Sequence, residues 1–289
     1  MGDLSTDITH EEILIPASDG FGLAASRFSS SQSKEGVVLI NSAAGVKRRF
    51  YNDLAGFLAE NNFTVYTYDY RGIGESSPGK LRGFQAKMSE WGLLDMNGMM
   101  AYIIQKHPEA KYSLIGHSIG GQILGLSKFN PNIKNAITVG AQKGNSKYWD
   151  GVWRLNMILL WYFVIPVASR LFGYFPSKII GAGDDLPKGV ALEWASWGRS
   201  KNWFFGLLLE AYLNFSGFSG KLMGVSISDD NYAPIRSVNA IMEEFKKAEI
   251  TRRHIYPDDL GVNHIGHFNL FRKKFKESFW KEMSDFLKS

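Results

Sequence analysis

Short apolar runs alternate with helical patterns along most of the chain. Glu12–Ile15 and Gly22–Phe28 flank a Ser-Asp-Gly turn and predict an opening β-hairpin. Four later runs have the length and the composition of buried strands: Gly36–Ile40, Thr64–Tyr68, Tyr112–Ile115 and Ala136–Val139. Helical spacing of apolar residues fills the intervals: Arg49–Asn61, Met96–Gln105 and Ile119–Lys128. This alternation predicts an α/β fold, with a mostly parallel sheet and helices on both of its faces.

The alternation stops after Gly140 and aromatic residues become frequent. Six of the eight tryptophans fall within the next stretch: Trp149, Trp153, Trp161, Trp194, Trp197 and Trp203. The strand and helix pattern then resumes: strand Met223–Ile227, helix Ile235–Phe245, strand Thr251–Tyr256 and helix Phe268–Phe286. We therefore predict one core, residues 1–145 and 214–289, with a helical, aromatic-rich cap inserted at residues 146–213.

Composition limits the class of protein. The chain has 289 residues and no cysteine, which excludes disulfides, thiolate metal sites and a cysteine nucleophile. Its net charge is +5, and the basic residues form short clusters without interleaved aromatics, so no nucleic-acid partner is predicted. The start, MGDLSTDITHEE, lacks a basic region followed by an apolar run, so we predict no secretory signal and expect a cytoplasmic protein.

The most apolar stretch is Met157–Ala168, which contains Pro166. Spanning the hydrocarbon of a bilayer takes about 20 apolar residues, so this stretch is too short by itself. It predicts a buried or amphipathic helix and no membrane span.

The strongest chemical signal is Gly116-His117-Ser118-Ile119-Gly120, which follows a predicted strand and opens a predicted helix. A G-x-S-x-G motif in this context is a nucleophile elbow, in which a strained corner exposes the serine. Glycines two residues before and after the serine allow the backbone to pass closely. We predict that Ser118 is a nucleophile.

A serine nucleophile needs a base and an orienting carboxylate, which follow such an elbow in the order Asp or Glu, then His. Only His254, His264 and His267 come late enough, and His254 lies inside a predicted strand. We prefer His267 to His264 as the base, because its small neighbour Gly266 frees the loop to approach and Phe268 can anchor the next helix. The acid is expected after the strand Met223–Ile227, where we prefer Asp230 to the adjacent Asp229.

An oxyanion hole takes one donor from the residue after the nucleophile, here Ile119, and another from the loop after the early buried strand. That loop reads Asn-Ser-Ala-Ala-Gly at 41–45. Its position predicts the Ala43 N–H as the second donor, with Ala44 as the alternative.

The segments VVLINSAAG, TVYTYDYRGIGES, LIGHSIGG, VSISDDNYAP and NHIGHFNLFR together resemble the α/β-hydrolase superfamily over nearly the entire chain. The cap segment LPKGVALEWASW resembles predicted bacterial hydrolases related to the serine aminopeptidase and monoacylglycerol-lipase-like group. The resemblance implies a triad of Ser118, Asp230 and His267. The chain departs from the common pattern at the oxyanion loop, where Asn-Ser replaces His-Gly.

These features predict a serine hydrolase that cleaves a carboxylic ester or thioester with an apolar acyl group, at neutral to alkaline pH. Peptide or amide hydrolysis of the serine aminopeptidase type is the alternative, and a non-catalytic binding protein with this fold is another. We expect no metal and no cofactor, a small-molecule acyl substrate as the partner, and an oligomeric state that the sequence leaves open. The substrate-binding candidates are the cap tryptophans Trp149, Trp153, Trp161 and Trp203.

Overall fold

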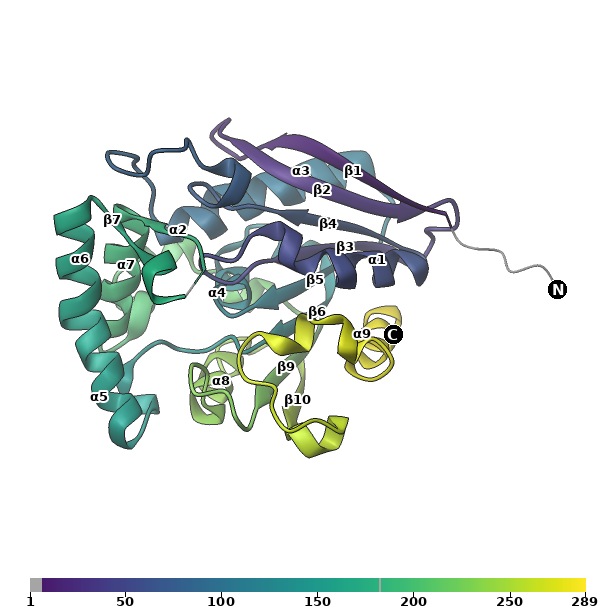
Figure 1. The fold of residues 1–289 in the computed structure, drawn as a ribbon. Helices are drawn as coiled ribbons and strands as arrows, with labels where there is room; N and C mark the ends of the chain where they lie inside the picture. Colours follow the sequence, from purple (N-terminus) through teal and green to yellow (C-terminus); the bar gives the residue numbers. More distant parts are fainter. Residues whose placement is uncertain (1–6, 182) are drawn as a thin grey trace.

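The computed structural model describes residues 7–181 and 183–289 of the chain. Within them an eight-stranded sheet runs in the order β1-β2-β4-β3-β5-β6-β9-β10 (Figure 1). Its strands are β1 Ile8–Pro16, β2 Gly22–Ser30, β3 Gly36–Asn41, β4 Phe63–Tyr68, β5 Tyr112–His117, β6 Ile133–Val139, β9 Lys221–Ile227 and β10 Glu249–Ile255. β2 pairs antiparallel with β1 and β4, and the other pairs are parallel. The carboxyl ends of β3, β5, β6 and β9 therefore meet at one edge of the sheet.

Helices cover both faces of the sheet, because the parallel strands carry apolar side chains on both sides. In β3, Val37 and Leu39 join one hydrophobic layer, while Val38 and Ile40 join the other. The helices of the core are α1 Asn52–Glu60, α2 Met88–Glu90, α3 Asn97–Lys106, α4 Ile119–Gln122, α8 Ile235–Met242 and α9 Phe279–Lys288. α3 shares the layer of Leu39, and α1 and α9 share the opposite layer.

The opening hairpin, the buried strands and the predicted α/β architecture are confirmed. Two predicted helices are too long. The helix predicted at Phe268–Phe286 is wrong over its first half, where two short 3-10 turns precede α9. The helix predicted at Ile119–Lys128 is α-helical only to Gln122 and continues as a 3-10 turn to Leu126.

The segment between β6 and β9 forms a separate group of helices at one end of the molecule, on the left in Figure 1. It contains α5 Gly151–Leu159, α6 Ile165–Phe172, the short hairpin of β7 Tyr174–Phe175 and β8 Leu186–Pro187, and α7 Lys188–Arg199. Because β6 and β9 are neighbours in the sheet, the chain leaves and re-enters the core at adjacent strands. We call residues 146–213 the cap, the boundaries that the sequence predicts.

The most apolar segment of the cap is longer and more exposed than the sequence suggested. α5 and α6 join through a π-helical turn, Leu160–Val164, into one 22-residue helix, Gly151–Phe172. The wide turn lies directly before Pro166, whose ring and missing N–H would disrupt a regular α-helix. By length and composition this helix is apolar enough to cross a membrane, and only 28% of its most apolar window is buried in the protein.

Candidate active site

Ser118 stands at a strained corner between β5 and α4, with φ 53° and ψ −118°. The glycines two residues before and after it are required because other backbone atoms lie very close to them. A Cβ at Gly116 would lie 2.5 Å from the Cα of Gly121, and one at Gly120 would lie 2.3 Å from the carbonyl oxygen of Asn41. Both contacts are closer than real Cβ atoms approach, so only glycine fits. Ser118 itself is partly exposed. The geometry is that of a nucleophile elbow.

His267 and Asp230 form a buried pair beside this corner. The His267 Nδ1 lies 2.6 Å from the Asp230 Oδ2, and the two side chains are 5% and 0% exposed. The other carboxylate oxygen of Asp230 accepts the backbone N–H groups of Tyr232 and Ala233. Because an ionised carboxylate only accepts, Nδ1 carries a proton and Nε2 is left as the basic nitrogen.

The imidazole lies against the backbone next to Ser118. A Cβ at Gly140 would be 2.9 Å from the His267 Cε1, and the preceding residue, Val139, accepts the Ser118 N–H through its carbonyl at 2.9 Å. Among the described residues, no hydrogen bond joins the Ser118 hydroxyl to the ring. Such a bond is often long or poorly aligned in an enzyme without substrate and tightens when substrate binds.

The adjacent Asp229 holds the loop that delivers the histidine. Its oxygens accept the N–H groups of Ile265 and Gly266 at 2.9 and 2.8 Å and contact His264 Nδ1 at 2.6 Å. Burial raises the pKa of Asp229, but these hydrogen bonds outweigh it and the net pKa is lowered. His264 is 67% exposed at the side chain and bonds this aspartate instead of Asp230. The two aspartates therefore serve different histidines.

A chain of hydrogen bonds connects the loop after β3, the elbow and His267. The Ala43 N–H donates to the Tyr51 hydroxyl oxygen at 2.9 Å, and that hydroxyl lies 2.8 Å from His117 Nδ1. His117 Nε2 lies 2.9 Å from the carbonyl oxygen of His267. Burial, and then the nearby His267, lower the pKa of His117 well below its usual value, so its ring is neutral. Nε2 must then carry the proton, and Tyr51 donates to Nδ1.

The hydrogen bonds of this loop bear on the choice between Ala43 and Ala44 as the second oxyanion donor. The N–H of Ala43 is already engaged by Tyr51, whereas the structure describes no hydrogen bond for the N–H of Ala44. The Ile119 N–H is the first of α4, a position without an intrahelical acceptor. Of the two loop amides, Ala44 is the one available to a ligand.

Asn41 stands where the common pattern has histidine, and it ties the oxyanion loop to the elbow. Its Nδ2 donates to the carbonyl of Gly120 at 3.1 Å, and its Oδ1 accepts the hydroxyl of Tyr68 at 2.9 Å. The side chain is fully buried. The link between these two loops is therefore buried in the core.

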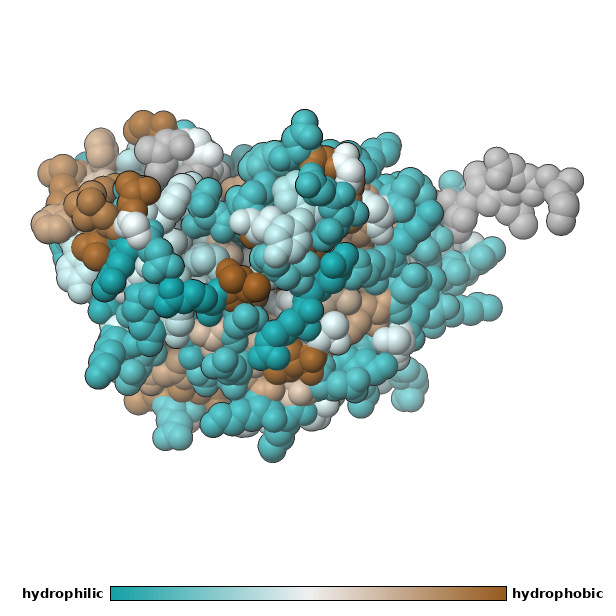
Figure 2. Space-filling view, turned by 90° about the horizontal axis from the view of Figure 1, so that it is seen from below, coloured by the Kyte–Doolittle hydropathy of each residue, from teal (hydrophilic) through white to brown (hydrophobic). Residues whose placement is uncertain are grey.

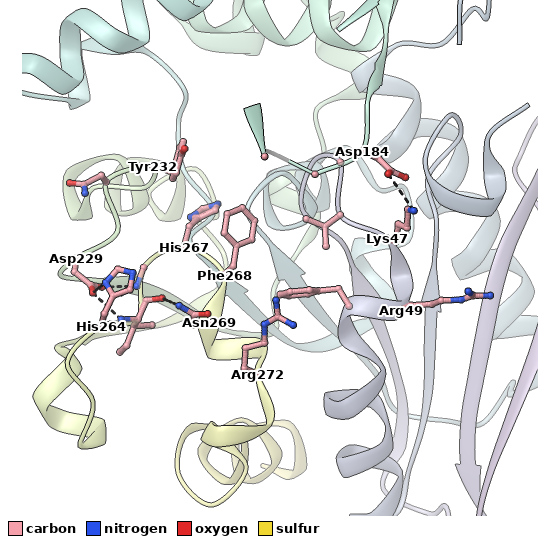
Figure 3. Close-up of a pocket in the computed structure, with 18 of the residues that line it drawn as sticks. Lys47, Arg49, Asp184, Asp229, Tyr232, His264, His267, Phe268, Asn269 and Arg272 are labelled. Atoms are coloured by element: carbon pink, nitrogen blue, oxygen red, sulfur yellow. Dashed lines mark hydrogen bonds and ion pairs between the residues drawn. The ribbon is translucent and has the colours of Figure 1, made fainter. Parts of the chain in front are cut away.

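A cavity of about 870 Å³ opens in front of His267 (Figure 3). Its size is typical of a small-molecule site. The loop after β3, the loops of Asp229 and His267, and the cap form its walls, and Trp153 is the predicted tryptophan that lines it. The apolar and aromatic side chains of the lining are Val46, Phe50, Trp153, Tyr232, Ile265 and Phe268. Ser118 is not among the lining residues.

The other three predicted tryptophans do not line this cavity. Trp149 is buried, and its indole N–H donates to the carbonyl of Asn231 at 2.9 Å. Trp161 and Trp203 are also buried and pack against other aromatic rings of the cap. Their bulk builds the cap interior, which a count of aromatics cannot distinguish from a pocket wall.

Among the described residues, no group of three or more His, Asp or Glu side chains is placed to hold a metal ion.

Comparisons with known proteins agree with this architecture. A family model described as serine aminopeptidase, S33, matches residues 32–169. An esterase from Pyrococcus furiosus superposes with a TM-score of 0.62 at 15% identity, over 97% of this chain and 91% of that one. A carboxyl esterase from Bacillus coagulans, solved with glycerol, gives 0.62 at 12% identity, over 96% and 98%. An esterase from Exiguobacterium antarcticum gives 0.59 at 16% identity, over 96% and 100%. No curated protein matches the sequence.

The structural matches show that the chain has the α/β-hydrolase fold, as its motifs predicted, and the family model matches part of it. The structural likenesses have low sequence identity, so they establish the fold alone.

Proposed function

We propose that the chain is a serine hydrolase that cleaves a carboxylic ester or thioester with an apolar acyl group through an acyl-enzyme. Ser118 is the nucleophile, His267 the general base and Asp230 the residue that orients the base. The observation that carries the proposal is the strained serine corner beside a buried His–Asp pair with a 2.6 Å contact.

The proposed reaction has two halves. Nε2 of His267 takes the Ser118 proton as Oγ attacks the carbonyl carbon, and the imidazolium then protonates the departing alcohol or thiol. A water molecule next loses a proton to the same nitrogen and attacks the acyl carbon. The imidazolium then returns the proton to the Ser118 Oγ as the ester bond to the serine breaks and the acid departs. Asp230 holds the ring in the productive tautomer throughout.

Two backbone amides are suited to the oxyanion. The Ile119 N–H lies at the start of α4, directly after the nucleophile. We assign the second donor to Ala44, because the Ala43 N–H is taken by Tyr51. Loss of one such donor costs about 3–4 kcal/mol of transition-state stabilisation.

The cavity lining favours an ester or thioester substrate over a peptide with a free amino terminus. An aminopeptidase must bind a free α-ammonium, and the cavity offers Asp184 and Asp229 as acidic groups. Asp184 lies 3.4 Å from the ammonium groups of both Lys47 and Lys178. Asp229 is engaged by the loop that carries His267, through two backbone N–H groups and His264. The rest of the lining that the structure describes adds no acidic group, and its apolar and aromatic side chains suit an acyl chain.

Peptide hydrolysis is a second candidate, because the matching family model is described as a serine aminopeptidase. A panel of p-nitrophenyl esters of increasing acyl length, run beside aminoacyl p-nitroanilides, separates the two. We expect ester turnover that rises with acyl length and little anilide turnover. Turnover of anilides alone would refute the ester assignment.

The assay needs variants that isolate the nucleophile. Ser118→Ala should reduce ester turnover by about 10³-fold or more, while Ser228→Ala, an exposed serine just after β9, should leave it unchanged. A folded wild-type chain without activity on either substrate class would favour a non-catalytic binding protein.

A further inference from the structure

The 22-residue helix of the cap, Gly151–Phe172, has two apolar faces. One face is buried in the cap: Met157, Trp161, Ile165 and Ser169 recur every four residues. It is fixed there by Arg199, which donates to the carbonyl of Trp161 at 2.6 Å. This attachment holds one face of the helix against the cap, so the helix lies along the surface of the protein.

The opposite face carries a continuous apolar stripe in contact with solvent. Its side chains recur every three or four residues and are 43–70% exposed: Val152, Leu155, Leu159, Phe163, Val167 and Leu171. We call these six residues the cap ridge. Figure 2 shows hydrophobic side chains gathered at the cap end of the molecule, while the rest of the face in this view is mostly hydrophilic. Exposed apolar patches of this kind mark interaction sites.

The charges along the helix are all cationic. Between Gly151 and Phe172 the charged residues are Arg154 and Arg170, near the two ends of the ridge, and both are exposed. Neither forms an ion pair within the described part of the chain. The nearest acid in sequence, Asp150, is already paired with Arg236 at 3.0 Å. An apolar stripe flanked by unpaired arginines is the composition of a helix that lies in a lipid interface.

The ridge also begins beside a residue that lines the cavity. Trp153, which lines the cavity, stands in the first turn of the helix, between Val152 and Arg154. An acyl chain that leaves a lipid surface under the ridge therefore meets the cavity wall at the same end of the cap.

From these observations we propose that the cap ridge binds the surface of an anionic phospholipid membrane, with the helix lying in the interface and not crossing it. A second part of the proposal rests on the proposed function: the substrate is an acyl ester or thioester dissolved in that membrane. Exposed leucines and phenylalanine enter the acyl region, and the two arginines meet the anionic headgroups.

Vesicle flotation tests the binding without any catalytic readout. The full chain is mixed with vesicles of phosphatidylcholine, with or without phosphatidylglycerol. We expect the wild type to float with the anionic vesicles. The double variant L155E/V167E should bind about 100-fold more weakly, since each side chain withdrawn from lipid changes the partition constant about tenfold or more. R154Q/R170Q should bind anionic vesicles roughly 30-fold more weakly.

Matched controls keep this outcome separate from that of the proposed function. Leu14→Glu places the same charge on an exposed leucine of β1, away from the cap, and should float like the wild type. Ser118→Ala should also float like the wild type, whether or not it retains ester hydrolysis. L155E/V167E should hydrolyse a short water-soluble ester at the wild-type rate, which also shows that it is folded.

Two results would overturn the proposal. One is a wild type that fails to float with anionic vesicles. The other is a wild type that is a dimer by light scattering without lipid, together with an L155E/V167E variant that is a monomer. The ridge would then be covered by a second copy of the chain.

Discussion

Replacing Tyr51 with phenylalanine removes one hydroxyl and leaves two buried polar groups without a hydrogen-bond partner. The Tyr51 hydroxyl accepts the Ala43 N–H at 2.9 Å and donates to His117 Nδ1 at 2.8 Å. The ring is fully buried and makes edge contacts with Phe271, which phenylalanine can preserve. Each buried group that loses its partner costs about 1–3 kcal/mol, so Tyr51→Phe should lower the free energy of unfolding by about 2–6 kcal/mol.

The same change should slow catalysis, because Tyr51 fixes His117, which in turn donates to the backbone of the base, His267. Tyr51 touches neither the cavity nor the reacting atoms, so it acts as a positioning residue. We expect kcat to fall by about 10- to 100-fold, with KM nearly unchanged. Denaturant unfolding and steady-state ester hydrolysis measure the two effects. Burial raises the pKa of Tyr51, so the hydroxyl keeps its proton and the effect should not vary with pH near neutrality.

Tyr66→Phe is the matched control. Its hydroxyl also pairs with a histidine, His107 at 2.9 Å, but this pair lies at the amino end of β5, the end opposite the elbow. The control should lose stability without loss of kcat. If Tyr51→Phe and Tyr66→Phe both retain wild-type kcat, the hydrogen-bonded link between loop, elbow and base has no role in catalysis.

Three further changes test other parts of the account. Asp230→Asn should lower kcat by about 10⁴-fold with little change in KM, as expected for a lost orienting carboxylate, and steady-state ester kinetics would contradict the triad if kcat stayed within tenfold. Gly120→Ala places a Cβ 2.3 Å from the carbonyl oxygen of Asn41, so thermal unfolding should show a loss of about 2 kcal/mol or more, and an unchanged melting temperature would rule out the tight corner. Burial raises the pKa of Glu193, and the hydrogen bonds from Ser89 only partly oppose this. The folded chain therefore keeps the Glu193 proton to a higher pH than the unfolded chain, in which the carboxyl titrates near 4.5. The free energy of unfolding should therefore decrease as pH rises above that value, Glu193→Gln should remove this part of the slope, and identical slopes in denaturant titrations would contradict it.

The fold was predictable because its strongest signals are local. Buried parallel strands are short continuous apolar runs, and the elbow motif brings its own glycines. The segment after Phe268 misled the prediction, because apolar residues at helical spacing continue from there into α9. In the structure two 3-10 turns bury the same side chains, Phe271 and Phe275 among them, without an α-helix.

The parts of the site that could not be predicted depend on distant contacts. Tyr51 and His117 are 66 positions apart, and no pattern in the sequence indicates that they meet. The choice between Ala43 and Ala44 depends on this same contact. Which tryptophans face the cavity likewise depends on how the cap packs, so Trp153 could not be distinguished from Trp161 by spacing alone.

The identity of the nucleophile can be measured directly. Folded wild-type protein is treated with a fluorophosphonate, which forms a covalent bond with an activated serine, and the modified peptide is located by mass spectrometry. The account predicts one added phosphonyl group, carried by Ser118, and no addition to Ser118→Ala or His267→Ala. Absence of labelling in the folded wild type, or modification of a different serine, would contradict it.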